Sequence, residues 1–232
     1  MADRARPDRA PLTARRGPGR PPRVDRSQIV EAAVDLVAAE GLTGITMARA
    51  AKGVGLSEMG LYRHVANRDE LVELVVDAAL DRIMPGDIPV PEDPADVRGV
   101  LVDLGHRLAR GLPDYPDVAA HLAVHGPRGP AGLRLMGTVL RLLSHAGVPR
   151  ELVPLAHGHY TSTICSVAVF RQHVLTPGQE AWGATAPDRL AGVEWTTDPA
   201  LEGIAGRYTG DVDTYQRYVI DRCVDAVLAD AT

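Results

Sequence analysis

Cysteine is scarce in this chain of 232 residues, which has only Cys165 and Cys223. Two thiols cannot build the disulfide framework of a small secreted domain, so a reducing, cytoplasmic setting is the simplest interpretation. Both cysteines lie in apolar helical patterns, where an inert buried thiol is the usual state. A redox-sensing pair is the alternative.

Several other features are missing as well. No run of about 18 apolar residues occurs, so we expect no transmembrane helix. The Arg- and Pro-rich N-terminal segment lacks an apolar stretch, so we expect no secretory signal. The chain also lacks a nucleophile–base motif, a zinc-ligand spacing and a glycine-rich phosphate loop. We therefore expect neither an enzyme nor a bound metal or cofactor.

Charge is distributed unevenly along the chain. The formal net charge is −5, yet residues 1–26 hold eight arginines against three aspartates, a net of +5. The remainder carries 17 basic and 27 acidic residues. A basic N-terminal arm on an otherwise acidic protein is typical of nucleic-acid binding.

The arm shows no helical or strand period, so we expect residues 1–24 to be disordered in isolation. Its segment from Arg15 to Arg23 places arginines beside Gly and Pro. An extended segment of this kind can enter a narrow A·T-rich minor groove, with Arg16, Arg20 and Arg23 as the inserted side chains. Non-specific attraction of a disordered tail to phosphate explains the composition equally well.

Residues 45–68 predict two short helices joined by a tight turn, followed by a third helix. Glycines at 53 and 55 end the first helix, the second runs over 58–65, and Glu70 has capping-box spacing in the third. Three short polar residues stand where these helices should begin: Thr46, Ser57 and Asn67. This is the outline of a helix-turn-helix, whose second helix lies in the DNA major groove.

The flanking segments support this interpretation. Upstream, Asp25 and Gln28 should cap a helix that Gly41 ends in a left-handed conformation. Both flanking helices have one apolar face, formed upstream by Ile29, Ala33, Leu36 and Val37, and downstream by Leu71, Val75, Ala78 and Ile83.

This arrangement resembles the N-terminal domain of the TetR family of transcriptional regulators. The resemblance lies in the helix from Ile29 to Gly41, in Ile45-Thr46, Ala51 and Val54-Gly55-Leu56-Ser57, and above all in the run from Leu61 to Leu71. Within that run, Leu-Tyr-x-His-Val-x-Asn-Arg looks most like the tetracycline repressor branch. The match is close in this part of the chain and loose in the rest.

The resemblance implies which side chains contact DNA. Phosphate contacts are implied for Thr46, Tyr62, His64 and Arg68, and the base-contacting part of the set is Glu58, Met59, Gly60 and Arg63, with Met47 beside them. Tyr62 could alternatively pack in the core on Leu71. Where the tetracycline repressor offers Arg and Gln to bases, this chain has Ala48 and Glu58. Its operator should therefore differ, and the arm should supply part of the affinity.

Prolines between Pro85 and Pro94 separate this unit from the rest of the chain. We therefore expect a DNA-binding domain over residues 25–84 and a ligand-binding and dimerisation domain over residues 85–232. Further helices are predicted at 95–111, 116–125, 130–146, 150–174, 198–207 and 211–229, with a long loop at 176–197. The predicted fold class is all-α, with about ten helices.

Two of these helices carry a pattern typical of a dimer interface. The last helix has a narrow stripe of Val212, Tyr215, Val219, Cys223 and Ala226, and the helix at 150–174 has small residues that include Gly158, Thr161 and Cys165. In the family that the chain resembles, the corresponding helices of two subunits form a four-helix bundle. An intrachain core is the alternative.

The resemblance also implies a ligand pocket among the remaining helices. Its polar candidates are His106, His121, His125, Arg134 and His157. His121 and His125 have a spacing compatible with a metal, but no third ligand is spaced with them, so surface or capping histidines are the preferred interpretation. The resemblance places His121 near a metal-liganding histidine of the tetracycline repressor, but the rest of that repressor's drug-and-metal residues do not recur, so magnesium-tetracycline is not the expected ligand.

The sequence thus predicts a homodimeric repressor that binds a palindromic operator in double-stranded DNA and is released by a small-molecule effector. Two other classes remain open. One is an enzyme with an incidental helix-turn-helix, which would show turnover without operator binding. The other is an architectural protein that binds any A·T-rich duplex through its arm alone.

Deletion of residues 1–22 tests the role of the arm. We expect weaker operator binding and a shallower dependence of affinity on salt, because fewer phosphates are neutralised. Operator affinity measured over a series of salt concentrations checks this. If affinity and salt slope are both unchanged, the arm makes no contribution.

Overall fold

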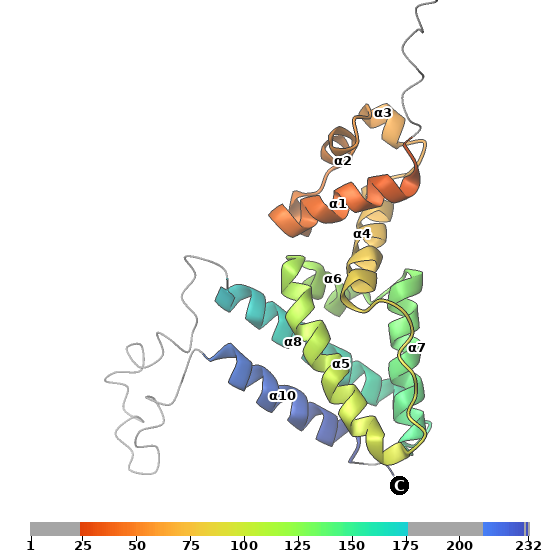
Figure 1. Ribbon diagram of the computed structural model, residues 1–232, viewed down its shortest axis with the longest axis vertical. Helices are drawn as coiled ribbons and strands as arrows, with labels where there is room; N and C mark the ends of the chain where they lie inside the picture. The colour runs from red at the N-terminus through yellow and green to blue at the C-terminus, as the bar shows by residue number, and fades with distance from the viewer. Residues whose placement is uncertain (1–23, 176–210, 230, 232) are drawn as a thin grey trace, which may run out of the picture.

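Every regular element of the described fold is a helix (Figure 1). The computed structural model describes residues 24–175, 211–229 and 231, and no β-strand occurs among them. The all-α prediction is confirmed. The predicted helix at 198–207 and the predicted loop at 176–197 lie outside the described residues.

The first three helices lie at one end of the molecule, and α4 leads from them into a bundle formed by the other helices (Figure 1). The helices are α1 (Arg26–Glu40), α2 (Met47–Gly53), α3 (Glu58–Leu61), α4 (Arg68–Ile83), α5 (Val97–Gly111), α6 (Val118–His125), α7 (Pro130–His145), α8 (Val153–Leu175) and α10 (Val212–Val227). Short 3-10 turns occur at η1 (Leu42–Gly44), η2 (Pro94–Asp96) and η3 (Leu112–Asp114). We refer to α1, α2 and α3 as the N-terminal unit.

The first four helices begin where their capping residues predict. Asp25 accepts a hydrogen bond from the Gln28 N–H at 2.9 Å, and the Gln28 side chain accepts one from the Asp25 N–H at 3.1 Å. The other caps are Thr46, Ser57 and Asn67, which accept from the N–H groups of Arg49, Gly60 and Glu70. The second capping box is only half formed, because the Glu70 carboxylate accepts from Ala66 instead of Asn67.

Two local predictions are wrong. The helix expected over residues 58–65 ends at Leu61, because the chain tightens there and the His64 N–H donates to the Leu61 carbonyl at 2.8 Å. Gly41 has the expected positive φ of 79°, but its ψ of 166° is not left-handed helical. This ψ directs the chain away from α1, so that the Leu42 N–H donates to the Pro116 carbonyl at 3.0 Å.

The interface between α1 and α4 forms the core of the N-terminal part. The side chains buried there include Ile29, Ala33 and Val37 of α1 and Leu71 and Val75 of α4. Arg82, near the end of α4, forms ion pairs with Glu31 and Asp35 of α1. Apolar packing and these ion pairs together set the angle at which the N-terminal unit sits on α4.

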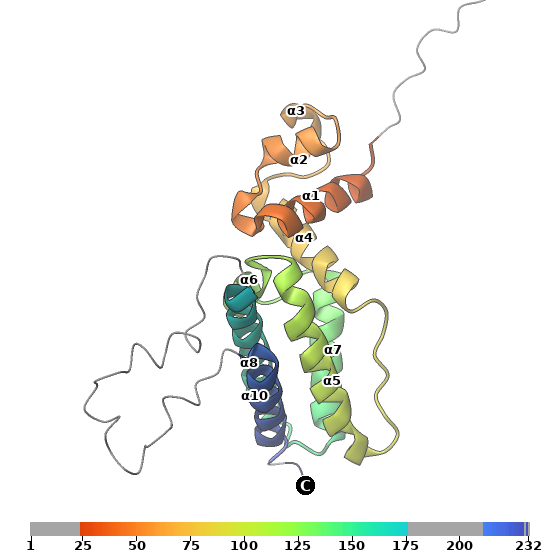
Figure 2. The ribbon, with the colours of Figure 1, turned by 60° about the vertical axis from the view of Figure 1, so that its left-hand side comes forward.

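In the bundle, α8 packs against α5, α6, α7 and α10 and is the central helix. It runs beside α10, as both ribbon views show (Figure 2). The buried Tyr160 of α8 donates its hydroxyl proton to the Leu101 carbonyl of α5 at 2.7 Å. This hydrogen bond fixes α8 on α5.

Gly132 of α7 packs tightly against the loop before this helix and against α4. Its N–H donates to Asp77 of α4 at 2.9 Å. A Cβ atom at this position would overlap Pro127 Cβ and lie 3.2 Å from Leu80 Cδ1. Gly137 on the same helix has more room, since a Cβ there would meet only the end of the Arg141 side chain, at 3.4 Å.

We expect Gly132→Ala to lower the free energy of unfolding by about 1–3 kcal/mol, because the rigid proline ring cannot move aside without backbone shifts. Gly137→Ala should instead raise it by roughly 0.5–1 kcal/mol through better helix propensity. Urea unfolding followed by circular dichroism measures both. Equal effects of the two changes would contradict the close approach.

Candidate nucleic-acid interface and internal cavity

A defined turn fixes α2 and α3 relative to each other. Gly55 has a φ of 69°, which glycine adopts without strain, and the Leu56 N–H donates to the Ala51 carbonyl at 2.9 Å. Ala50 and Leu61 are buried between the helices. The result is a helix-turn-helix, with α3 at the outer end of the molecule (Figure 1).

The outer surface of α3 presents side chains that suit DNA. Glu58 and Arg63 are exposed, and the Met59 side chain is 74% exposed despite being apolar. Tyr62 is 46% exposed, so it is not a core tyrosine. These four residues, two in α3 and two directly after it, combine a base-edge donor, an acceptor, an apolar contact and a phosphate donor within six positions.

Two predicted DNA contacts are not available on this surface. Met47 is only 6% exposed, because its side chain points from the first turn of α2 into the core. Gly60 is buried against Ser57 and Leu56. Thr46 is exposed, but its hydroxyl caps α2, and His64 is partly buried. Arg16, Arg20 and Arg23 lie outside the described residues.

Arg68 has partners within the chain. Its Nε donates to the Ile45 carbonyl at 3.0 Å, and one terminal nitrogen donates to the Leu42 carbonyl at 3.3 Å. The guanidinium therefore attaches the first turn of α4 to the segment between α1 and α2. Its remaining N–H groups are available for phosphate. The sequence motif reveals this arginine but not its carbonyl partners.

The segment after α1 also contacts the bundle directly. The Thr43 hydroxyl donates to the Asp117 carboxylate at 3.2 Å, next to the hydrogen bond between Leu42 and Pro116. Asp117 has a positive φ of 71°, a conformation that Asp adopts more readily than most residues. Its N–H donates to the Gln172 side chain of α8 at 3.2 Å. Pro116 and Asp117 predict a turn, but nothing in the sequence indicates these partners.

A cavity of about 400 Å³ lies in the bundle between α4, α5, α6, α7 and α8. Most of its lining is aliphatic, as in Leu80, Leu104, Leu108, Leu122, Leu135 and Met136. Its described lining includes no Asp, Glu, Lys or Arg side chain. A mostly apolar cavity of this volume with few polar groups is typical of a small-molecule site.

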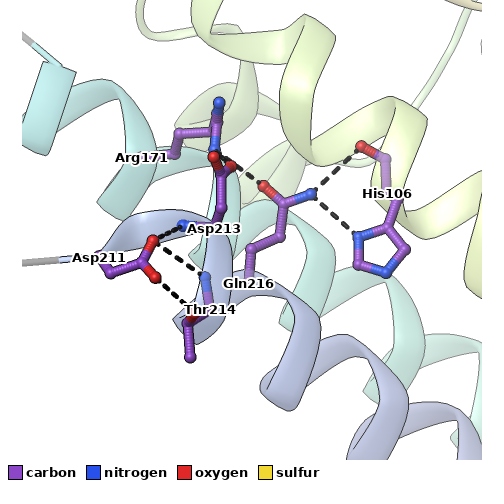
Figure 3. A network of polar contacts seen from close by, with 6 residues as sticks. All are labelled: His106, Arg171, Asp211, Asp213, Thr214 and Gln216. Atoms are coloured by element: carbon purple, nitrogen blue, oxygen red, sulfur yellow. Dashed lines mark hydrogen bonds and ion pairs between the residues drawn. The ribbon is translucent and has the colours of Figure 1, made fainter.

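Of the five polar pocket candidates, His157 lines this cavity and the other four do not. His106 belongs instead to a polar network between α5, α8 and α10 (Figure 3). There the buried Gln216 contacts His106 Nδ1 at 3.0 Å and accepts from Arg171 at 3.2 Å, while Arg171 also pairs with Asp213 at 2.6 Å. Burial is the main cause that lowers the pKa of His106.

The other three candidates lie elsewhere. The tilted rings of His121 and His125 have centroids 4.5 Å apart in a polar hollow beneath the N-terminal unit, and His121 contacts Glu73 of α4 at 3.3 Å. Arg134 pairs with Asp81 of α4 at 2.7 Å. Helical spacing shows that His121 and His125 share a face of α6, but it does not show which cavity that face borders.

The residues predicted for a dimer interface separate into two groups. Thr161 and Cys165 line the cavity and Cys223 is in the core, so these three face inward. Tyr215 is exposed, Val219 is partly buried, and a Cβ at Gly158 would meet only open space. Further apolar side chains exposed on α8 and α10 are Leu155, Val169 and Tyr218. The intrachain alternative thus holds for the first group only.

The two thiols are held in their protonated form. Burial raises the pKa of Cys165 to about 11 and also raises that of Cys223. A thiolate, not a thiol, reacts with oxidants, so the environment of these cysteines is that of structural residues. The redox-sensing alternative has no support here.

Solved structures with the same arrangement of helices are known. The chain is similar to the TetR family protein ActR of Streptomyces coelicolor, solved in complex with actinorhodin, with a TM-score of 0.77 and 25% identity over 91% of this chain and 98% of ActR. The chain has the fold of the TetR family of transcriptional regulators. No family model matches this regulator.

The curated relatives of this chain agree with the structural match. An HTH-type transcriptional regulator of Saccharopolyspora erythraea is 27% identical over 197 residues, 85% of this chain and 80% of that protein. The HTH-type transcriptional repressor DrrR1 of Streptomyces coeruleorubidus is 32% identical over 130 residues, 54% and 46% of the two chains. The protein is therefore a DNA-binding transcriptional regulator. No described helix combines the length and apolar character that a membrane span needs.

Alkylation of the cysteines tests their burial. With a pKa of about 11, Cys165 has a far smaller thiolate fraction near pH 8 than an ordinary cysteine. We expect iodoacetamide to modify Cys165 and Cys223 at least about tenfold more slowly in the folded regulator than in urea, and the rate at Cys165 to rise with pH up to about 11. Mass spectrometry of quenched time points measures both. Equal folded and unfolded rates would show that the thiols are accessible.

Proposed function

We propose that this protein is a ligand-responsive repressor, a homodimer that binds a palindromic operator and is released when a small molecule fills the cavity. The path of α4 carries the proposal. At its first turn, Arg68 is bonded to the backbone of the N-terminal unit, and near its last turn Leu80 lines the cavity. One helix thus joins the candidate DNA surface to the candidate ligand site.

In this proposal α3 lies in the major groove. Arg63 donates to guanine, Glu58 accepts from cytosine N4 and Met59 contacts a thymine methyl group. Phosphate contacts come from Thr46, Tyr62, His64 and the remaining N–H groups of Arg68. Arg16, Arg20 and Arg23 enter the adjacent minor groove. Residues 25–84 form the DNA-binding domain, and the protein acts on chromosomal DNA in the cytoplasm.

We propose that dimers form through the outer faces of α8 and α10. Val169, Tyr215 and Tyr218 leave apolar surface exposed there, and the open space at Gly158 permits close approach of a second helix. Burial of this surface would favour association. A two-fold axis between the bundles would present two N-terminal units to half-sites about 34–36 Å apart.

Release requires a ligand that binds more tightly to the conformation whose N-terminal units do not match the half-sites. Contact of the ligand with Leu80 provides such a difference, because any displacement of α4 also moves Arg68 and the segments bonded to it. Couplings of this kind amount to about 1–3 kcal/mol. The complex of ActR with actinorhodin supports a small-molecule effector.

Footprinting on the DNA that flanks the gene for this protein tests the proposal, followed by anisotropy titrations of the protected sequence. We expect Arg63→Gln to weaken operator binding by roughly ten- to a hundredfold, the usual range for a lost bidentate base contact. Arg150→Gln, in the turn before α8, is the matched control and should change affinity by less than about twofold.

If Arg63→Gln binds the operator as tightly as the wild-type protein does, α3 does not lie in the major groove as proposed. Equally tight binding to a random A·T-rich duplex would favour a protein that binds through its arm alone. Repetition of the footprint with candidate metabolites tests release, and protection that no metabolite alters would argue against an effector-controlled repressor.

A further inference from the structure

The cavity contains an unused hydrogen-bonding group. His157 of α8 lines the cavity, and its Nε2 is buried without a hydrogen-bond partner in the described structure. A buried polar atom without a partner costs free energy, so such atoms in folded proteins are usually paired with protein, water or ligand. An unpaired nitrogen in the wall of an apolar cavity indicates a partner that arrives from the cavity.

The neighbouring hydroxyl groups already have partners. The Tyr160 hydroxyl donates to the Leu101 carbonyl at 2.7 Å, and the Thr161 hydroxyl donates to the His157 carbonyl at 2.9 Å. Cys165 is a weak hydrogen-bonding group whose thiol stays protonated. Both hydroxyl donors are therefore used, and these oxygens can only accept further hydrogen bonds. Among the described side chains that line the cavity, His157 is the one with a buried nitrogen that has no partner.

The lining also excludes charge. No described Asp, Glu, Lys or Arg side chain lines the cavity, so a charged ligand would lose its hydration without gaining an ion pair. Burial lowers the pKa of His157, so the imidazole is neutral near pH 7 and offers no charge to a carboxylate. A neutral imidazole offers one donor and one acceptor, which suit an uncharged hydroxyl or carbonyl group.

We propose that the effector is an uncharged, mostly apolar molecule with a hydroxyl or carbonyl group, and that this group hydrogen-bonds to His157 Nε2. The inference rests on the proposed function, because it takes this cavity as the effector site. It adds the chemical class of the ligand and the residue that selects it.

Three probes of similar size separate the contribution of a hydroxyl group from that of a charge: 1-naphthol, naphthalene and 1-naphthoate. We expect calorimetry without DNA to show that the wild-type protein binds 1-naphthol roughly five- to tenfold more tightly than naphthalene, the usual worth of one neutral hydrogen bond. It should bind 1-naphthoate at least about tenfold more weakly than 1-naphthol. Bound 1-naphthol should also slow alkylation of Cys165, which lines the same cavity.

Variants of α8 test the assigned residue. His157→Phe keeps the apolar bulk and should remove the preference for 1-naphthol over naphthalene, while His157→Gln should restore part of it through its amide. His159→Phe, two residues along on the exposed side of the helix, is the matched control and should leave the preference unchanged. Thermal unfolding of each variant confirms that it is folded.

The inference is overturned if 1-naphthoate binds best, if none of the probes binds, or if His157→Phe keeps the preference. Operator release is measured separately. Binding of 1-naphthol that depends on His157 but leaves operator affinity unchanged would support this inference while contradicting the proposed release mechanism. Release by another metabolite without dependence on His157 would support the proposed release mechanism while contradicting this inference.

Discussion

The packing of α1 on α4 is the interaction on which the rest of the structure depends. Leu71 and Val75 hold α4 against the N-terminal unit, and Leu80, further along the same helix, belongs to the wall of the cavity. Ion pairs of Arg82 with α1 and of Arg134 with α4 reinforce this position from both sides. Because α4 is continuous from Arg68 to Ile83, the site of one function cannot shift along it without affecting the other.

Local features of the fold could be predicted because their causes are local. Thr46, Ser57 and Asn67 cap helices whose backbone N–H groups lie within three residues, so the sequence contains both partners of each hydrogen bond. The premature end of α3 and the ψ of Gly41 were missed. In the case of Gly41 the ψ accompanies a hydrogen bond from Leu42 to Pro116, which is distant in sequence. No local pattern encodes that contact.

The residues of the candidate sites were likewise predictable only where their positions depend on local sequence. The exposed residues of α3 follow from the motif, because its geometry is repeated wherever the motif occurs. Placement of the histidines depends on how whole helices rotate against one another, and so His157 reached the cavity while His106 joined a network with Gln216. Likewise, α8 has small residues on more than one side, and spacing could not show that Thr161 and Cys165 face inward.

The hydrogen bonds at Asp117 have a mechanical consequence. The N-terminal unit is attached to the bundle at α4 and again where Thr43 meets Asp117, which is itself bonded to Gln172 of α8. The second attachment restricts how the unit can turn relative to the bundle more than its packing on α4 alone would. The directions in which it can leave a DNA groove are therefore limited by the fold before any ligand binds.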